Sequence, residues 1–199
     1  MIEAYGKLPF YKDYINIITS PEASIWQEWL LKVFGQKDTL IPQNIWQFLF
    51  FPARDARLVT GLIMQGSDGR RNFPFSLFVT LGKSNIKNQM KWAELFVIKD
   101  NLIRIFNNLH TASDIDSCYV TLSGLTMEIR NKDIKSTYLK SVNLPDLKRF
   151  THCMDHEFPG FSIISQGSIT GLSQGNLPGN EIISRWEPLT FNPNIQISN

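Results

Sequence analysis

Two short segments near the N-terminus combine charged side chains with residues that bend the backbone. Residues 5–9 read Tyr-Gly-Lys-Leu-Pro, and residues 66–74 read Gly-Ser-Asp-Gly-Arg-Arg-Asn-Phe-Pro. In the second segment, Asp68 can accept backbone N–H groups in a turn, and Gly69 permits a positive φ. Arg70 and Arg71 supply guanidinium donors that suit an acidic or phosphorylated partner. Alternatively, Asp68 pairs with an arginine and only fixes the turn.

The first bend leaves the same two interpretations open. Its glycine and proline turn the chain, while Tyr5 and Leu8 can anchor it in the core. Lys7 is the one residue in this bend that packing does not require, and Asp13 follows after a further turn. The bend therefore either seats the first strand against the first helix or contributes to a contact surface.

One cluster of metal-capable side chains occurs in the sequence, at residues 151–156. His152 and His156 are four residues apart, which places two imidazoles on one face of a helix, and Cys153 lies between them. A structural zinc site needs further ligands, usually from a second motif. His110 and Cys118 stand elsewhere at no recognisable spacing. We therefore expect no metal site and no cofactor.

The sequence contains no motif typical of a catalytic nucleophile. Cys118 lies in the apolar-leaning run Asp-Ser-Cys-Tyr-Val, where a buried and inert thiol is the usual case. No Gly-x-Ser-x-Gly elbow is present. The glycines at 167, 171 and 175 lack the strand–turn–helix context of a nucleotide loop. We predict no catalytic residue, so the chain is not expected to be an enzyme.

The composition predicts a packed globular protein. The chain has 199 residues, of which 43% are hydrophobic, and its formal net charge is +2. This charge is too small to predict binding to nucleic acid or to an anionic membrane through the overall field. No apolar run is long enough to cross a bilayer and no signal peptide is recognisable, so we expect a cytoplasmic protein without membrane insertion.

Sequence patterns predict strands interleaved with helices. The clearest helix starts after Ser20 as N-cap with Pro21 in the first position, and we expect Gly35 to end it in a left-handed conformation. Residues 57–64, 73–82, 161–165 and 181–191 are predicted strands, and residues 91–109 a long helix. Residues 41–52 fit either a strand or a short helix. The Gly- and Ser-rich residues 166–180 predict a flexible loop.

This order of elements predicts a single α+β domain over residues 1–199. The expected architecture is a layered one, with a mixed or mainly antiparallel sheet flanked by helices. Residues 57–64 and 73–82 are continuously apolar, which indicates strands that are buried on both faces.

Several unusual motifs over residues 4 to 82 occur together in one order. The first block is Tyr5-Gly6-Lys7-Leu8-Pro9, then Asp13-Tyr14-Ile15, then Trp26-x-x-Trp29-Leu30. The second is Trp46-x-Phe48, Gly61-Leu62-Ile63-Met64, and Ser67-x-x-Arg70-Arg71-x-Phe73-Pro74-Phe75. This arrangement resembles the TagF (ImpM) family of type VI secretion system-associated proteins. The chain departs from the family pattern at Lys12, where the family has glycine, and at Gln47, where it has arginine.

The resemblance implies a regulator and not an enzyme. TagF-like proteins are implicated in post-translational repression of type VI secretion, beside a kinase and phosphatase pathway that modifies a forkhead-associated-domain scaffold. We therefore expect this chain to bind or sequester a secretion component such as that scaffold. The expected partner-binding residues are Lys7, Phe10, Tyr11, Asp13, Asp68, Arg70 and Arg71.

Two other functions stay open at the level of sequence. The Arg70-Arg71 loop could hold a small phosphorylated ligand or substrate, with Asp13 or Asp68 as base. The chain could also be a structural subunit of the secretion machine.

Overall fold

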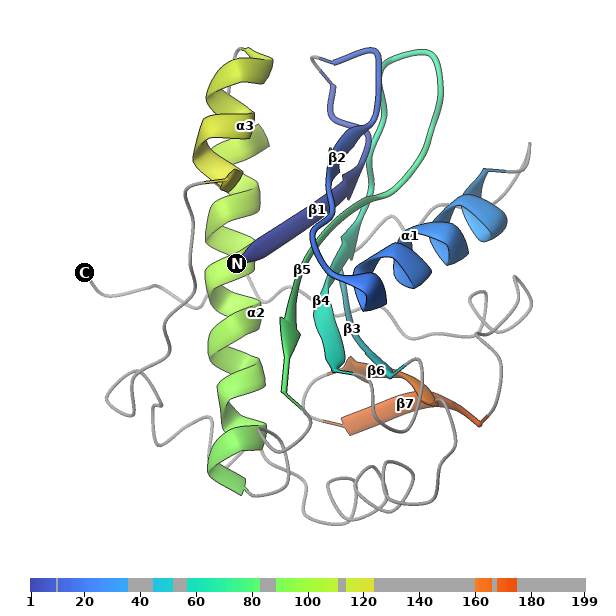
Figure 1. Cartoon of the computed structure of the whole chain (residues 1–199), viewed down its shortest axis with the longest axis vertical. Coiled ribbons are helices and arrows are strands. Elements are labelled where there is room, and N and C mark those ends of the chain that lie inside the picture. The colour runs from blue at the N-terminus through green and yellow to red at the C-terminus, as the bar shows by residue number, and fades with distance from the viewer. Residues whose placement is uncertain are drawn as a thin grey trace.

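The described strands form one seven-stranded antiparallel sheet (Figure 1). The computed structural model describes residues 1–9, 11–35, 45–51, 57–82, 89–110, 114–123, 160–165 and 168–174. The strand order is β2-β1-β5-β4-β3-β6-β7. The strands are β1 (Ile2–Gly6), β2 (Ile15–Ile17), β3 (Trp46–Phe51), β4 (Leu58–Met64), β5 (Phe75–Leu81), β6 (Gly160–Ser165) and β7 (Ser168–Gln174).

Helices cover both faces of this sheet. Helix α1 (Pro21–Phe34) lies on one face, and α2 (Gln89–His110) with α3 (Ile115–Ser123) lies on the other (Figure 1). The predicted α+β class and layered, mainly antiparallel architecture are confirmed. None of the helices within the described ranges combines the length and apolarity that a bilayer crossing requires.

The central strands are buried on both faces because alternate side chains enter two different cores. In β4, Leu62 belongs to the cluster that packs under α2, whereas Ile63 belongs to the cluster that packs under α1. In β5, Leu77 and Phe78 divide in the same way. The continuous apolar runs in these strands therefore follow from the three-layer arrangement, as the sequence predicted.

Aromatic residues dominate the core beneath α1. Trp26 is fully buried, and its ring stacks on Phe48 at 3.9 Å and on Trp29 at 4.7 Å between centroids. Its indole N–H donates to the Ser76 hydroxyl in β5 at 3.2 Å. Trp26 therefore connects the helix to β3 and β5, the strands on either side of the middle strand β4.

Helix α1 begins as predicted and ends differently. Ser20 is the N-cap, and its hydroxyl accepts the Ala23 N–H at 3.2 Å. Gly35 has φ −76° and a right-handed conformation, so the prediction of a left-handed Gly35 was wrong. The reason is that its N–H still donates to the Leu31 carbonyl at 2.9 Å, which continues the helical geometry through this residue.

The predicted loop over residues 166–180 is also partly wrong, because residues 168–174 form β7. Glycine and serine favour loops locally, but β7 pairs antiparallel with β6, and Ile169 lies opposite Ile164. Pairing with a neighbouring strand outweighs weak local preference. Residues 41–52 contain β3, which decides between the two alternatives in favour of a strand. The predicted strand at 181–191 and the 151–156 cluster lie outside the described residues.

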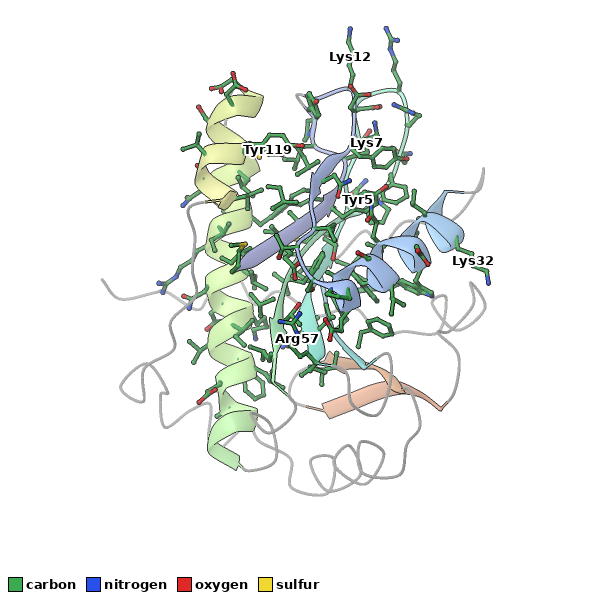
Figure 2. All side chains as sticks on the ribbon, viewed as in Figure 1. Tyr5, Lys7, Lys12, Lys32, Arg57 and Tyr119 are labelled. Atoms are coloured by element: carbon green, nitrogen blue, oxygen red, sulfur yellow. The ribbon has the colours of Figure 1, made fainter. Side chains whose placement is uncertain are left out.

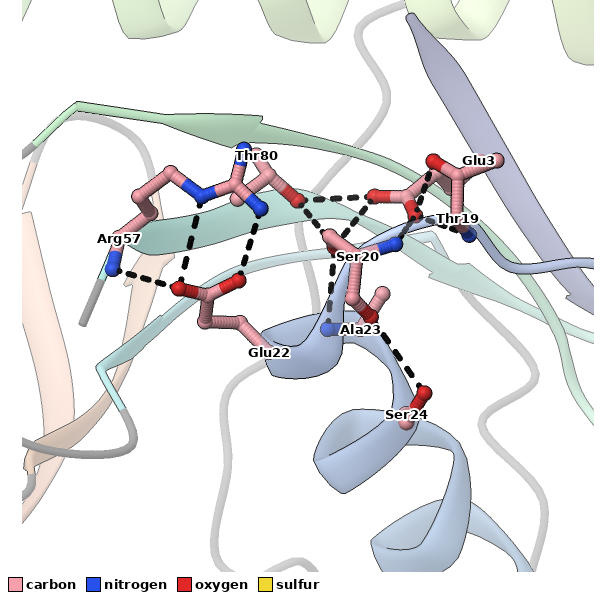
Figure 3. Close-up of polar contacts among 8 residues, drawn as sticks. All are labelled: Glu3, Thr19, Ser20, Glu22, Ala23, Ser24, Arg57 and Thr80. Atoms are coloured by element: carbon pink, nitrogen blue, oxygen red, sulfur yellow. Dashed lines mark hydrogen bonds and ion pairs between the residues drawn. The ribbon is translucent and has the colours of Figure 1, made fainter.

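A buried carboxylate joins β1 to the start of α1 (Figure 3). Glu3 accepts the N–H of Thr19 at 2.7 Å, the N–H of Ser20 at 2.8 Å and the Thr80 hydroxyl at 2.8 Å. Burial by itself raises the pKa of Glu3, but these hydrogen bonds together outweigh it, so the pKa lies below its ordinary value. Beside this network, Arg57 and Glu22 form an ion pair at 3.0 Å.

We expect Glu3 to make the folded state sensitive to acid. Because its pKa is lower in the folded chain than in the unfolded chain, its stabilising effect is complete above the ordinary value of 4.5. The effect is lost as the pH falls through the lower, folded-state pKa. Glu3→Gln should therefore destabilise the protein by about 2 kcal/mol at neutral pH, and by less in acid. Urea unfolding of both proteins across this range measures the difference, and a constant difference would contradict the assignment.

Candidate functional site

The two bends that the sequence singled out lie side by side at one end of the sheet (Figure 1). Strand β1 pairs with β5, and Gly6 at the end of β1 lies opposite Phe75 at the start of β5. The connection after β1 and the connection before β5 consequently leave the sheet at the same edge. We call the surface formed by residues 7–9, 11–14 and 65–74 the two-bend corner.

The backbones of the two bends touch directly. Gly6 has φ +138°, and a Cβ atom there would lie 2.1 Å from the Pro74 carbonyl oxygen. At Gly66, a Cβ atom would lie 2.5 Å from the carbonyl oxygen of Lys7. Both positions therefore require glycine, because any side chain would push the bends apart.

A buried ion pair connects the two bends. Lys7 Nζ lies 2.9 Å from Asp68 Oδ2, and the two side chains are only 0% and 3% exposed. Lys7 also donates to the Lys12 carbonyl oxygen. The Lys7 ammonium group, followed by the backbone N–H groups of Arg71 and Arg70, holds the pKa of Asp68 well below its usual range. Asp68 is therefore ionised at neutral pH.

Arg71 makes a second connection across the corner. Its guanidinium donates to Asp68 Oδ2 at 3.2 Å and to the Lys12 carbonyl oxygen at 2.9 Å. The Arg71 side chain is nevertheless 59% exposed. It thus stabilises both bends and also presents positive charge to solvent.

The backbone N–H groups at the tip of the second bend already have acceptors within the loop. Asp68 Oδ1 accepts the N–H of Arg70 at 2.9 Å and that of Arg71 at 2.7 Å. The Gly69 N–H donates to the Ser67 hydroxyl at 3.0 Å. Gly69 has φ +80°, which confirms that this turn uses a left-handed glycine. The loop is therefore a closed turn that holds its conformation without a ligand.

Aromatic rings support the charged groups from below. Lys7 Nζ lies 4.4 Å from the centroid of the Tyr14 ring, and Arg71 lies 6.0 Å from the same ring. Tyr14 stacks on Tyr5 at 5.4 Å and meets the edge of Phe73 at 4.9 Å. These contacts attach the corner to the core beneath α1, so the corner is a well-ordered part of the fold.

The structure places the predicted partner-binding residues in two groups. Arg70, Arg71 and Asp13 are exposed and Tyr11 is half-buried, so these residues can reach a partner. Phe10 lies outside the described residues.

Lys7 and Asp68 do not fit the predicted role of direct contacts, because each is buried against the other. They hold the corner together instead.

Sequence reasoning overlooked Lys12 as a member of the site. It is exposed, its carbonyl oxygen accepts from both Lys7 and Arg71, and its side chain extends away from the molecule (Figure 2). The signal that could have found it was its departure from the family pattern, since a lysine there replaces a glycine. Glu3 was missed as well, because nothing local indicates that a single acidic residue in a strand is buried.

Two groups in the described part of the chain that could take part in catalysis, Asp68 and Cys118, have shifted pKa values. Asp68 is a poor base at neutral pH, because both of its oxygens are occupied by donors and its pKa is low. Cys118 is buried, as predicted, and burial raises the pKa of its thiol to about 11. Within the described ranges, no three His, Cys, Asp or Glu side chains gather closely enough to hold a metal ion.

Comparison with known proteins supports the fold. No family model and no curated protein sequence matches the chain. Among solved structures, the crystal structure of PA0076 from Pseudomonas aeruginosa PAO1 is similar, with a TM-score of 0.57 and 16% sequence identity. The similarity covers 93% of this chain and 93% of that chain. At this identity the likeness concerns the arrangement of the elements.

Proposed function

We propose that this protein is a non-enzymatic, post-translational repressor of a type VI secretion system. In this proposal it binds a component of the machinery in the bacterial cytoplasm, such as a forkhead-associated-domain scaffold, and holds it apart from the assembling apparatus. The contact surface is the two-bend corner. Repression then follows from occlusion, because a component bound at the corner is unavailable to its other partners.

One observation carries this proposal. The two glycine-containing motifs that resemble TagF proteins meet in space at the corner. Gly6 of the first motif lies against the Pro74 carbonyl of the second, and Lys7 bonds to Asp68, which is 61 positions away in the chain. A sequence pattern that specifies one exposed and internally braced surface is typical of a protein whose role is to dock onto another.

The alternative of a small phosphorylated ligand finds less support in the geometry. Phosphate-binding loops offer several free backbone N–H groups to the anion. Here the N–H groups of Gly69, Arg70 and Arg71 are all used within the turn. The suggested base, Asp68, is held as a carboxylate by Lys7. Protein binding uses the exposed side chains of the corner and needs none of these groups.

Charge reversal at Arg70 tests the proposal without disturbing the corner. The Arg70 side chain is exposed and has no ion-pair partner among the described residues. In pull-downs from cells with active secretion, we expect Arg70→Glu to reduce capture of the secretion component at least tenfold, and to relieve repression. Arg104→Glu is the matched control, since Arg104 is an exposed arginine on α2.

The melting temperatures of both variants should equal that of the wild type. If Arg70→Glu and Arg104→Glu captured the component equally well, the corner would not be the docking surface. If neither the wild type nor the variants captured any secretion component, the proposed function itself would fail.

A further inference from the structure

We infer that the two-bend corner recognises an acidic polypeptide segment, one that presents several carboxylates to the corner. This inference rests on the proposed function and adds the chemistry of the partner. It depends on the net charge of the corner. It also depends on the burial of the Lys7–Asp68 ion pair, which leaves the other charged side chains facing solvent.

The corner holds as much excess positive charge as the whole chain. Its two bends contain four basic residues and two acidic ones, which gives a net charge of 4 − 2 = +2. The formal net charge of all 199 residues is also +2. Outside the corner, basic and acidic residues balance in number, and the net positive charge of the corner attracts an anionic partner.

Burial of the Lys7–Asp68 pair determines which of these charges face solvent. Both side chains are almost completely covered, so this ammonium and carboxylate neutralise one another inside the corner. Asp68 also pairs with Arg71 at 3.2 Å, although the Arg71 side chain remains 59% exposed. The exposed charges that remain are those of Lys12, Arg70 and Arg71 together with Asp13. The corner thus exposes three cations and one anion.

Two of these cations have no partner of their own among the residues that the structure describes. Neither Lys12 Nζ nor the Arg70 guanidinium forms an ion pair or hydrogen bond with any residue in the described ranges. Figure 2 shows that Lys12 extends from the end of the molecule, on a different part of the surface from Lys32 of α1. Solvated cations at the tip of an ordered corner can meet carboxylates without breaking existing contacts.

The arrangement favours several separate carboxylates over one phosphoryl group. A phosphoryl site usually concentrates convergent donors on three oxygens, including backbone N–H groups. At this corner those N–H groups bond to Asp68 and Ser67, and the Arg71 guanidinium already bonds to Asp68 and to the Lys12 carbonyl. The donors that remain are individual side chains on two different bends. A run of glutamates or aspartates can satisfy such donors one at a time.

Fluorescence anisotropy with defined peptides tests this inference. The probes are a labelled decapeptide of alternating glutamate and serine, its glutamine counterpart, and the glutamine peptide with one phosphothreonine. The glutamate peptide should bind the wild-type protein, and its affinity should fall as salt is added. Lys12→Ala with Arg70→Ala should weaken this binding about tenfold, the sum of two exposed charge contacts.

The matched control removes a lysine and an arginine elsewhere. Lys32→Ala with Arg104→Ala changes the net charge equally, at exposed positions on α1 and α2, and should retain wild-type affinity. Equal losses in the two double variants would overturn the inference, since only bulk charge would then matter. So would failure of the glutamate peptide to bind, or tenfold tighter binding of the phosphothreonine peptide. In each of these cases, capture of a secretion component that still depends on Arg70 would leave the proposed function intact.

Discussion

Replacing Asp68 with alanine is expected to lower the melting temperature by about 10 °C. The substitution leaves the Lys7 ammonium, which is 0% exposed, without the carboxylate 2.9 Å away. Among the described residues, the Lys12 carbonyl oxygen and the face of the Tyr14 ring remain beside it. A buried charge that has lost its counter-ion is among the most destabilising single defects in a protein. Thermal unfolding followed by circular dichroism measures the loss.

A second substitution distinguishes two effects of removing Asp68. One is the unpaired charge of Lys7, and the other is the loss of the hydrogen bonds that Asp68 accepts within the turn. Lys7→Met removes the ammonium and keeps a side chain of similar size, so in the Asp68→Ala background it should recover more than half of the lost melting temperature. The double variant should still capture its partner poorly, because the two bends are no longer tied together. If Asp68→Ala melted like the wild type, or if Lys7→Met gave no recovery, the pair would not stabilise the corner.

Trp26→Ala is expected to destabilise the protein by about 4 kcal/mol, through loss of buried area and formation of a cavity. Trp26 is fully buried and stacks on both Phe48 and Trp29, so little of the surrounding structure can move in to fill the space. Its contacts join α1 to the sheet. Chemical denaturation of the purified variant measures the change.

Trp26→Phe serves as the comparison for this position. Phenylalanine keeps most of the stacking surface and loses the hydrogen bond to Ser76, so we expect it to cost clearly less than alanine. A loss below about 1 kcal/mol for Trp26→Ala would contradict the packing described beneath α1.

Local signals in the sequence predicted the elements whose formation depends on local physics. The start of α1 was predictable because Ser20 and Pro21 act within a single turn of helix. Strands β4 and β5 were predictable because their continuous apolar runs match burial on both faces. The predicted loop over residues 166–180 was partly wrong because glycine and serine indicate only a local preference, whereas β7 forms by pairing with β6.

The sequence predicted where the candidate site lies, but it predicted the roles of the residues in the site only in part. Lys7 and Asp68 were recognised as unusual and were assigned to partner binding. The sequence also allowed Asp68 to pair with an arginine and fix the turn, and it does pair with Arg71. Lys7 and Asp68 contact one another across 61 positions in the chain, which a reading of each bend alone could not show. Lys12 was overlooked for the same reason, since its importance depends on hydrogen bonds from Lys7 and Arg71 to its carbonyl oxygen. Contacts between residues that are far apart in the sequence therefore determine which residues of the corner are exposed and which support it.

Photo-crosslinking in cells tests the docking surface most directly. A benzoylphenylalanine at position 11 replaces the half-buried Tyr11 with another aromatic side chain inside the corner, and the same group at position 25 replaces exposed Ile25 on α1. We expect irradiation to link a type VI secretion component to position 11 and not to position 25. Adducts at position 25 alone, or equal adducts at both positions, would contradict the assignment of the two-bend corner as the surface that binds the partner.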